Sequence, residues 1–122
     1  MSDCYCDYDP PEFYRMSVRT ARKEHRCDEC GKRIVAGEKY EVVVGKWDGN
    51  LGTFETCEQC RDLRQWTQNN VPCFCWAHGN ILEDAKEAVV EAQYRAPTET
   101  VGLYFGFLRR LHSIKRPDRH AP

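Results

Sequence analysis

The sequence is notable first for what it lacks. Its 122 residues contain no run of about 20 consecutive apolar side chains, the length that a membrane-spanning helix needs. The segment Met1 to Asp7 is polar and acidic, without the apolar core of a secretion signal. Eighteen Lys and Arg stand against nineteen Asp and Glu, so a net charge of −1 gives no bulk attraction to nucleic acid or membranes. We therefore expect one cytoplasmic domain with no membrane partner.

Against this background the eight cysteines stand out, because they occur as four close pairs. In a reducing compartment such pairs are typical of metal ligands rather than disulfides. Structural zinc takes four thiolates, so eight cysteines predict two zinc ions per chain. The pairs are Cys4 with Cys6, Cys27 with Cys30, Cys57 with Cys60, and Cys73 with Cys75.

The two C-x-x-C pairs predict the first site, with Cys27, Cys30, Cys57 and Cys60 as ligands. Gly31 follows the first pair and permits a tight knuckle, whose backbone N–H groups point at the thiolates. The second pair stands at the start of a predicted helix, where the helix dipole favours negative charge. This spacing predicts a structural zinc site.

The two C-x-C pairs predict the second site, in which Cys4 and Cys6 meet Cys73 and Cys75. Neither pair completes a tetrahedron alone, so one shared ion would tie the N-terminal segment to the middle of the chain. Two alternatives are His78 in place of one cysteine, or an exposed N-terminal tail that does not join a site. An iron–sulfur cluster would take the same four thiolates as zinc.

Hydrophobic patterning predicts a small α+β domain. The expected strands are 13–20, 38–45 and 53–56, with hairpin-turn residues at 48–50. The expected helices are 58–68, 81–95 and 98–115, with Asn80 as an N-cap paired with Glu83 and Pro97 ending the second helix. We expect residues 1–122 to form one domain: a zinc module over 1–78, a helical hairpin over 79–116 and a tail over 117–122.

The run from Ala21 to Tyr40 places basic residues and His25 before C-x-x-C-Gly, followed by Ile34, Gly37-Glu38 and Tyr40. It resembles small treble-clef zinc proteins of bacteriophages and prophages, and more distantly the first half of a LIM-type finger. The resemblance covers residues 19–64 and implies a treble clef over about 19–68, made of a knuckle, a hairpin and a helix. It also implies a phage-encoded protein that acts in a bacterial cell on a host protein or machine, such as one of transcription or defence.

The ligand pattern disfavours catalysis. Catalytic zinc keeps one ligand position open for water, and two four-cysteine sites leave none. Treble-clef nucleases of the HNH type carry a catalytic histidine on the hairpin, whereas residues 41–56 contain no histidine. We therefore expect no catalytic residues and a non-enzymatic binding module, with a metal-dependent enzyme as the least favoured alternative.

Two segments are candidates for contact with a partner. The predicted C-terminal helix is apolar on more than one face, which favours binding of a protein, including a second copy of this chain. Residues 15–33 carry seven basic side chains against three acidic ones, which makes nucleic acid the alternative partner. The candidate contact residues are Arg15, Arg19, Arg22, Lys23 and Arg26 in the basic segment, and Tyr104, Phe105, Phe107, Arg109 and Arg110 in the helix.

Overall fold

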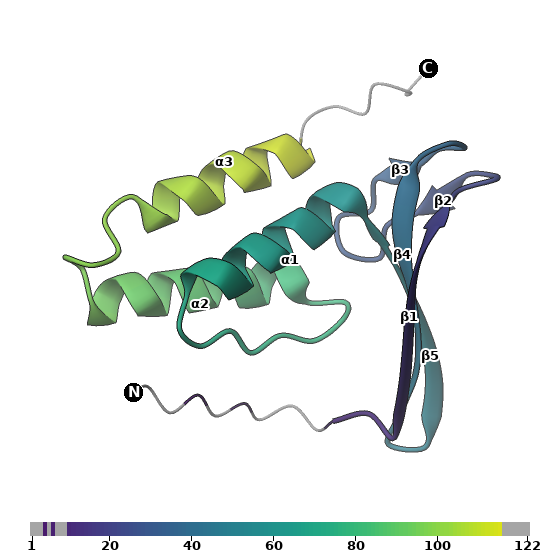
Figure 1. The fold of residues 1–122 in the computed structure, drawn as a ribbon, viewed down its shortest axis with the longest axis horizontal. Coiled ribbons are helices and arrows are strands. Elements are labelled where there is room, and N and C mark those ends of the chain that lie inside the picture. Colours follow the sequence, from purple (N-terminus) through teal and green to yellow (C-terminus); the bar gives the residue numbers. More distant parts are fainter. Residues whose placement is uncertain (1–3, 5, 7–9, 116–122) are drawn as a thin grey trace.

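The computed structural model describes Cys4, Cys6 and residues 10–115. Three helices lie on one side of a three-stranded sheet, and a short two-stranded ribbon lies near one end of that sheet (Figure 1). The predicted mixed α+β class is confirmed. The tail expected over 117–122 falls outside the described residues. Among the described residues, no helix is long and apolar enough to cross a membrane.

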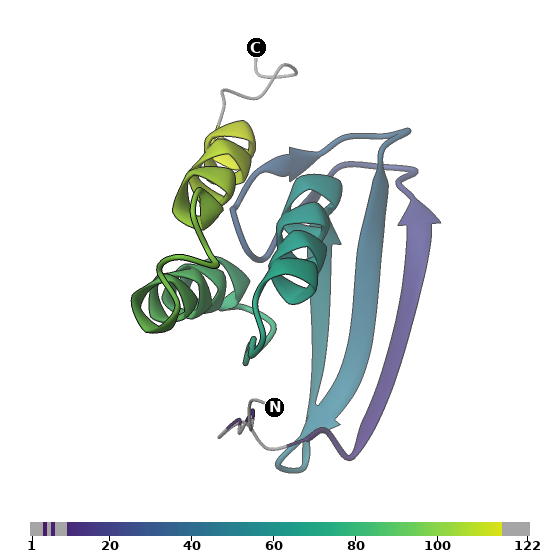
Figure 2. The same cartoon turned by 60° about the vertical axis from the view of Figure 1, so that its left-hand side comes forward.

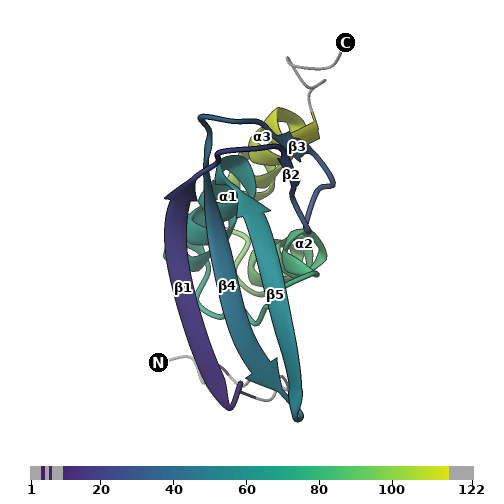
Figure 3. The ribbon, with the colours of Figure 1, turned by 90° about the vertical axis from the view of Figure 1, so that its right-hand side faces the viewer.

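The main sheet is antiparallel with β4 at its centre (Figure 3). Its strands are β1 (Phe13–Thr20), β4 (Lys39–Trp47) and β5 (Asn50–Cys57). The two hairpin strands are longer than expected, because pairing continues to the rung Trp47–Asn50 beside a two-residue turn. That turn, Asp48-Gly49, has φ values of 50° and 79°, whose backbone twist matches that of the flanking strands.

The central strand β4 is covered on both faces. The sequence predicts one face with Tyr40, Val42 and Val44, of which Tyr40 and Val42 are buried and Val44 is partly buried. Val43 and Glu41, which alternate with them, have no exposed surface at all. A central strand packed on both faces therefore carries a carboxylate in the protein interior, which a simple alternation pattern does not predict.

The three helices are α1 (Glu58–Asn70), α2 (Ile81–Arg95) and α3 (Leu103–Lys115). Helix α1 lies between the sheet and the α2–α3 pair (Figure 2). It buries Cys60, Leu63 and Thr67 on one face, while Val89 of α2 and Phe107 of α3 complete the core. The cysteine pair at the start of α1 thus stands at the junction of all layers.

Helix α3 begins at Leu103 rather than at the expected residue 98. The backbone N–H groups of Glu99 and Thr100 both donate to the carbonyl of Ala96, and the N–H of Leu103 donates to the carbonyl of Thr100. These bonds form successive turns after Pro97 instead of a helix. Thr98, Thr100 and Val101 are poor helix formers, and Gly102 has a φ of 82°, so the helix begins only after Gly102.

The N-terminus of α2 is capped from a distance. Asn80 occupies the predicted N-cap position but makes no capping bond, because its side-chain amide donates to Asp84 at 2.9 Å. Glu29, from the cysteine knuckle, instead accepts hydrogen bonds from the backbone N–H groups of Gly79 (2.5 Å) and Ile81 (2.8 Å). A carboxylate is favourable there because the helix dipole is positive at its N-terminus. Glu29 therefore fastens the knuckle to the helical layer.

Candidate metal centres

The first cysteine cluster brings together sulfurs from two segments of the chain. Cys27 and Cys30 lie in the knuckle between β2 (His25–Arg26) and β3 (Arg33–Ile34), Cys57 is the N-cap of α1, and Cys60 lies in its first turn. The Sγ atoms of Cys27 and Cys60 are 3.8 Å apart, as are those of Cys30 and Cys57. Four sulfurs at about 2.3 Å from one zinc ion are roughly 3.8 Å from one another. The cluster therefore has the dimensions of a tetrahedral zinc site.

Backbone N–H groups converge on the sulfurs of this cluster. The N–H groups of Glu29 and Cys57 donate to Cys27 Sγ at 3.4 and 3.3 Å, and that of Cys60 donates to Cys57 Sγ at 3.5 Å. Hydrogen bonds to neighbouring thiols lower the pKa of Cys27, whereas such bonds, with burial, raise the pKa of Cys57 and Cys60. Four thiolates packed this closely repel one another, so a cation is needed to hold all four deprotonated.

The knuckle is also bound to β5. The N–H of Asp28 donates to the carbonyl of Glu55, and the N–H of Glu55 donates to the carboxylate of Asp28 at 2.6 Å. His25 precedes the knuckle. Its Nδ1 atom is 2.7 Å from the Glu55 carboxylate, and its Nε2 atom is 3.3 Å from the Tyr40 hydroxyl. These contacts fix the position of Cys27 and Cys30 relative to the strand that leads into Cys57.

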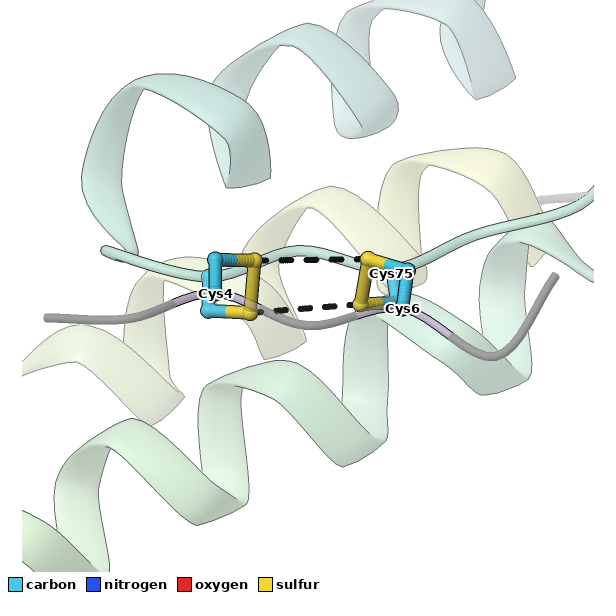
Figure 4. Close-up of side chains that lie close together, drawn as sticks. Cys4, Cys6 and Cys75 are labelled. Atoms are coloured by element: carbon cyan, nitrogen blue, oxygen red, sulfur yellow. Dashed lines mark hydrogen bonds between the residues drawn. A yellow bond between two sulfur atoms is a disulfide. The ribbon is translucent and has the colours of Figure 1, made fainter. Parts of the chain in front are cut away.

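The second cysteine cluster joins the N-terminal segment to the chain after α1 (Figure 4). Its four Sγ atoms lie within 4.8 Å of one another. In contrast to the sequence expectation, disulfides link Cys4 to Cys73 and Cys6 to Cys75, because the two C-x-C segments lie side by side. Opened by reduction, the same side chains present four thiolates to one ion, and both clusters are consistent with zinc binding.

His78 lies apart from this ligand group. Its Nε2 atom is 2.8 Å from the Tyr14 hydroxyl, and its ring stacks on Phe54. Burial, with the charge of Arg64, lowers its pKa, against the opposing effect of Glu41. The alternative in which His78 replaces a cysteine is not supported by these contacts, since the four cysteines already complete the cluster.

The second cluster makes a stoichiometric prediction. Under reducing conditions we expect Cys4→Ser to lower bound zinc from about two ions to about one per chain, because three thiolates leave an incomplete tetrahedron. The fold should survive, since Cys4 is exposed. Elemental analysis with a thermal melt checks both statements, and Ser17→Ala, which removes a hydroxyl elsewhere, is the control. Unchanged zinc content would show that Cys4 is not a ligand.

The candidate contact residues of the basic segment fall into two groups in the structure. Arg19, Arg22 and Lys23 line one hollow of about 780 Å³ together with His25 and Tyr40. The exposed Arg15 lies on the same strand face as Arg19, whereas Arg26 folds back to donate to the carbonyl of Gly31 at 2.5 Å. Part of the predicted basic segment therefore forms one concave surface.

The candidate contact residues of α3 also fall into two groups, exposed residues and residues that pack within the fold. Phe105 is 67% exposed and Arg109 is exposed. Phe107 is only 1% exposed, so it is a core residue and not a contact residue. Tyr104 is half-buried and stacks on Phe107. Arg110 places its guanidinium 4.5 Å above the Trp66 ring, which gives it a packing role within the fold.

Comparison with known proteins identifies no relative of this chain. No family model matches the sequence, and neither a curated protein nor a solved structure matches it significantly. Function must therefore be inferred from the site geometry and exposed surfaces.

Two groups of residues were missed by sequence analysis. The first is a buried ion network, in which Arg64 donates two hydrogen bonds to Glu41 at 2.8 and 2.6 Å and Arg61 lies 3.3 Å from the same carboxylate. The second is an aromatic cluster at the hairpin end of the sheet. Its members are Tyr14, Trp47, Phe54, Phe74, Trp76 and His78. The only available signal was the density of rings in the segment 74–78.

Proposed function

We propose that this chain is a non-enzymatic binding module, stabilised by two zinc ions, that acts by contacting another protein. The order of knuckle, hairpin and helix around Cys27, Cys30, Cys57 and Cys60 supports a treble clef as the organising unit of residues 19–68. Both candidate metal sites are built entirely from cysteine, which suits a structural role for the ion. The functional surface is then to be sought away from the metals.

The observation that carries this proposal is the exposure of large apolar side chains on the helical hairpin. Tyr94 of α2 is 84% exposed, and Phe105 of α3 is 67% exposed. Val90 and Leu108, on the same helices, are also exposed. Isolated apolar residues on a surface are common, but aromatic rings without cover on adjacent helices are typical of protein interfaces.

The test is a capture experiment from bacterial lysate with nuclease present. We expect the wild-type chain to retain a protein in stoichiometric amounts, or to sediment as a dimer when alone. The double variant Tyr94→Ser, Phe105→Ser should lose this association while keeping its melting temperature. Leu51→Ser, which removes an equally exposed apolar side chain from β5, is the matched control. Association that persists in the double variant would contradict the proposal.

The resemblance of residues 19–64 to phage treble-clef proteins guides the choice of partner. If the chain acts in an infected bacterial cell, host proteins of transcription and defence are the first candidates for the captured partner. This choice rests on the resemblance alone, and the capture experiment does not depend on it.

The basic hollow supports a second candidate function, the binding of nucleic acid. Among the described residues, no salt bridge involves Arg19, Arg22 or Lys23. Three unneutralised cations around one concavity, beside the exposed Arg15, are complementary to a phosphate backbone.

The salt dependence of nucleic-acid binding distinguishes phosphate contacts made in this hollow from attraction by the overall surface charge. For a single strand, log K changes with log salt by about −0.7 per phosphate contacted, so removing three contacts lowers the slope by about two. We expect this from the triple variant Arg19→Gln, Arg22→Gln, Lys23→Gln. The control triple variant Lys86→Gln, Arg95→Gln, Lys115→Gln has the same net charge and should keep the slope. Equal slopes in both variants would exclude the hollow.

A further inference from the structure

A pocket of about 1000 Å³ lies at the hairpin end of the sheet, remote from the basic hollow. It is bounded by the β4–β5 hairpin, the segment 74–78 and the prolines that precede β1. All six rings of the aromatic cluster line it, and Cys6 and Cys75 of the second cysteine cluster close one side. Its volume lies at the upper end of the range for small-molecule sites, about 300–1000 Å³.

The backbone makes room for these rings. Gly45 and Gly52 face one another across β4 and β5. A Cβ atom at Gly45 would lie 2.4 Å from the Trp47 ring, so only glycine permits the indole to lie across the strand. A Cβ atom at Gly52 would be 3.4 Å from both the Trp47 and Phe54 rings. The positions of these two rings are therefore set by the sheet and do not await a ligand.

The formal charge on the described residues that line the pocket is negative. Of the lining residues that the structure describes, Asp48 in the hairpin turn is the only one with a formally charged side chain, and it is exposed at the rim. Glu12, near the turn, accepts a hydrogen bond from the Gly49 N–H and lies 3.7 Å from the ammonium of Lys46, so its charge is already paired. Aromatic faces are themselves negative, because of the ring quadrupole. Anions are thus disfavoured and organic cations are favoured.

The aromatic cluster already holds one cation on its inner side. The guanidinium of Arg64 lies 4.9 Å from the centre of the Trp76 ring. Its two hydrogen bonds to Glu41 offset part of the repulsion that its charge exerts on a second cation in the pocket. A guanidinium or ammonium over an aromatic face gains electrostatic energy that an uncharged group of the same shape lacks.

We propose that this aromatic pocket binds an alkylated ammonium group, held against the rings of Trp47 and Phe54 and opposite the carboxylate of Asp48. Such a group occurs in small metabolites and on methylated lysine side chains of proteins. The pocket is separate from the exposed apolar residues of α2 and α3. The binding of an ammonium group here is therefore tested independently of the protein contact proposed above.

The test compares two compounds of the same shape that differ in charge. Choline carries a quaternary ammonium, and 3,3-dimethylbutan-1-ol replaces its nitrogen with carbon. We expect choline to bind about tenfold more tightly than the alcohol, as measured by calorimetry and by tryptophan fluorescence. Equal affinity for the two compounds, or no binding of choline, would overturn the proposal.

Variants locate the binding in this pocket. Asp48→Asn should weaken choline binding several-fold and leave the alcohol unchanged, and asparagine tolerates the left-handed φ of 50° at this turn position. Asp62→Asn, which neutralises an exposed carboxylate on α1 outside the pocket, is the matched control. Phe54→Leu should weaken choline at an unchanged melting temperature. If Asp48→Asn and Asp62→Asn bind choline equally, the pocket is not the site.

A peptide series identifies the source of the group. A short Gly-Ser peptide with one trimethyllysine is compared with the same peptide carrying unmodified lysine and with free choline. Tighter binding of the trimethylated peptide than of choline indicates a methylated protein tail, and the reverse order indicates a small metabolite. If the unmodified peptide binds as well as the trimethylated one, alkylation is not recognised and the proposal fails.

Discussion

Replacing Cys60 with serine is expected to unfold the protein. Cys60 has no exposed surface and joins the knuckle to α1 at the junction of the sheet and the helices. Binding of structural zinc contributes roughly 10–16 kcal/mol to folding in small zinc domains. A domain of ordinary stability has only about 5–15 kcal/mol in total. Loss of one ligand therefore removes a binding free energy as large as the entire free energy of unfolding.

Circular dichroism and elemental analysis measure this effect. We expect Cys60→Ser to show no cooperative melt and to lose the zinc ion of the first cluster. The neighbouring variant Gln59→Ser, at an exposed position of the same helical turn, should melt like the wild type. A Cys60→Ser protein with full zinc content and a normal melt would show that this cluster does not hold the fold together.

The second large effect is expected at Glu41. Its carboxylate is completely buried and bound to Arg64 and Arg61. Removing one partner of a buried ion pair leaves the others without compensation and costs about 3–5 kcal/mol. We expect Glu41→Ala to lower the free energy of unfolding by this amount in urea titrations. The exposed Glu58→Ala should change it little, and equal stability of the two variants would contradict the network's role.

The same residue gives a pH dependence. Burial alone would raise the pKa of Glu41, but the hydrogen bonds and charges of Arg64 and the charges of Arg61 and His78 together hold it below the ordinary value of 4.5. A carboxyl group with a lowered pKa stabilises the fold above its unfolded pKa and loses that contribution as the pH falls through the folded value. The melting-temperature difference between wild type and Glu41→Gln should therefore shrink below about pH 4.5. A constant difference would exclude ionisation as the cause.

Sequence reasoning was most successful where local chemistry decides the structure. The knuckle with Gly31, the turn Asp48-Gly49 and the first strand all follow from short-range rules, and the structure contains them. The cysteine spacing also predicted which sulfurs meet, because two C-x-x-C pairs flanking a hairpin are brought together when the hairpin closes.

Long-range contacts escaped prediction for a physical reason. Glu29 caps a helix more than fifty positions away, and Glu41 is buried because α1 brings Arg64 over the central strand. Neither partner can be inferred from local pattern, since both residues would normally be placed on the surface. The aromatic pocket likewise depends on how the segment 74–78 returns to the hairpin. Phe74, Trp76 and His78 alternate along one segment, but no local pattern connects them with Tyr14, Trp47 and Phe54, which come from distant strands.

We propose that metal ions bound by cysteine organise this fold, and the zinc content of the purified chain is the direct test. The chain should be prepared under reducing conditions, so that both clusters present thiolates, and its zinc measured by elemental analysis and native mass spectrometry. We expect about two zinc ions per chain, together with loss of the folded signal when a strong chelator removes them. A reduced, folded chain that contains no zinc would contradict it.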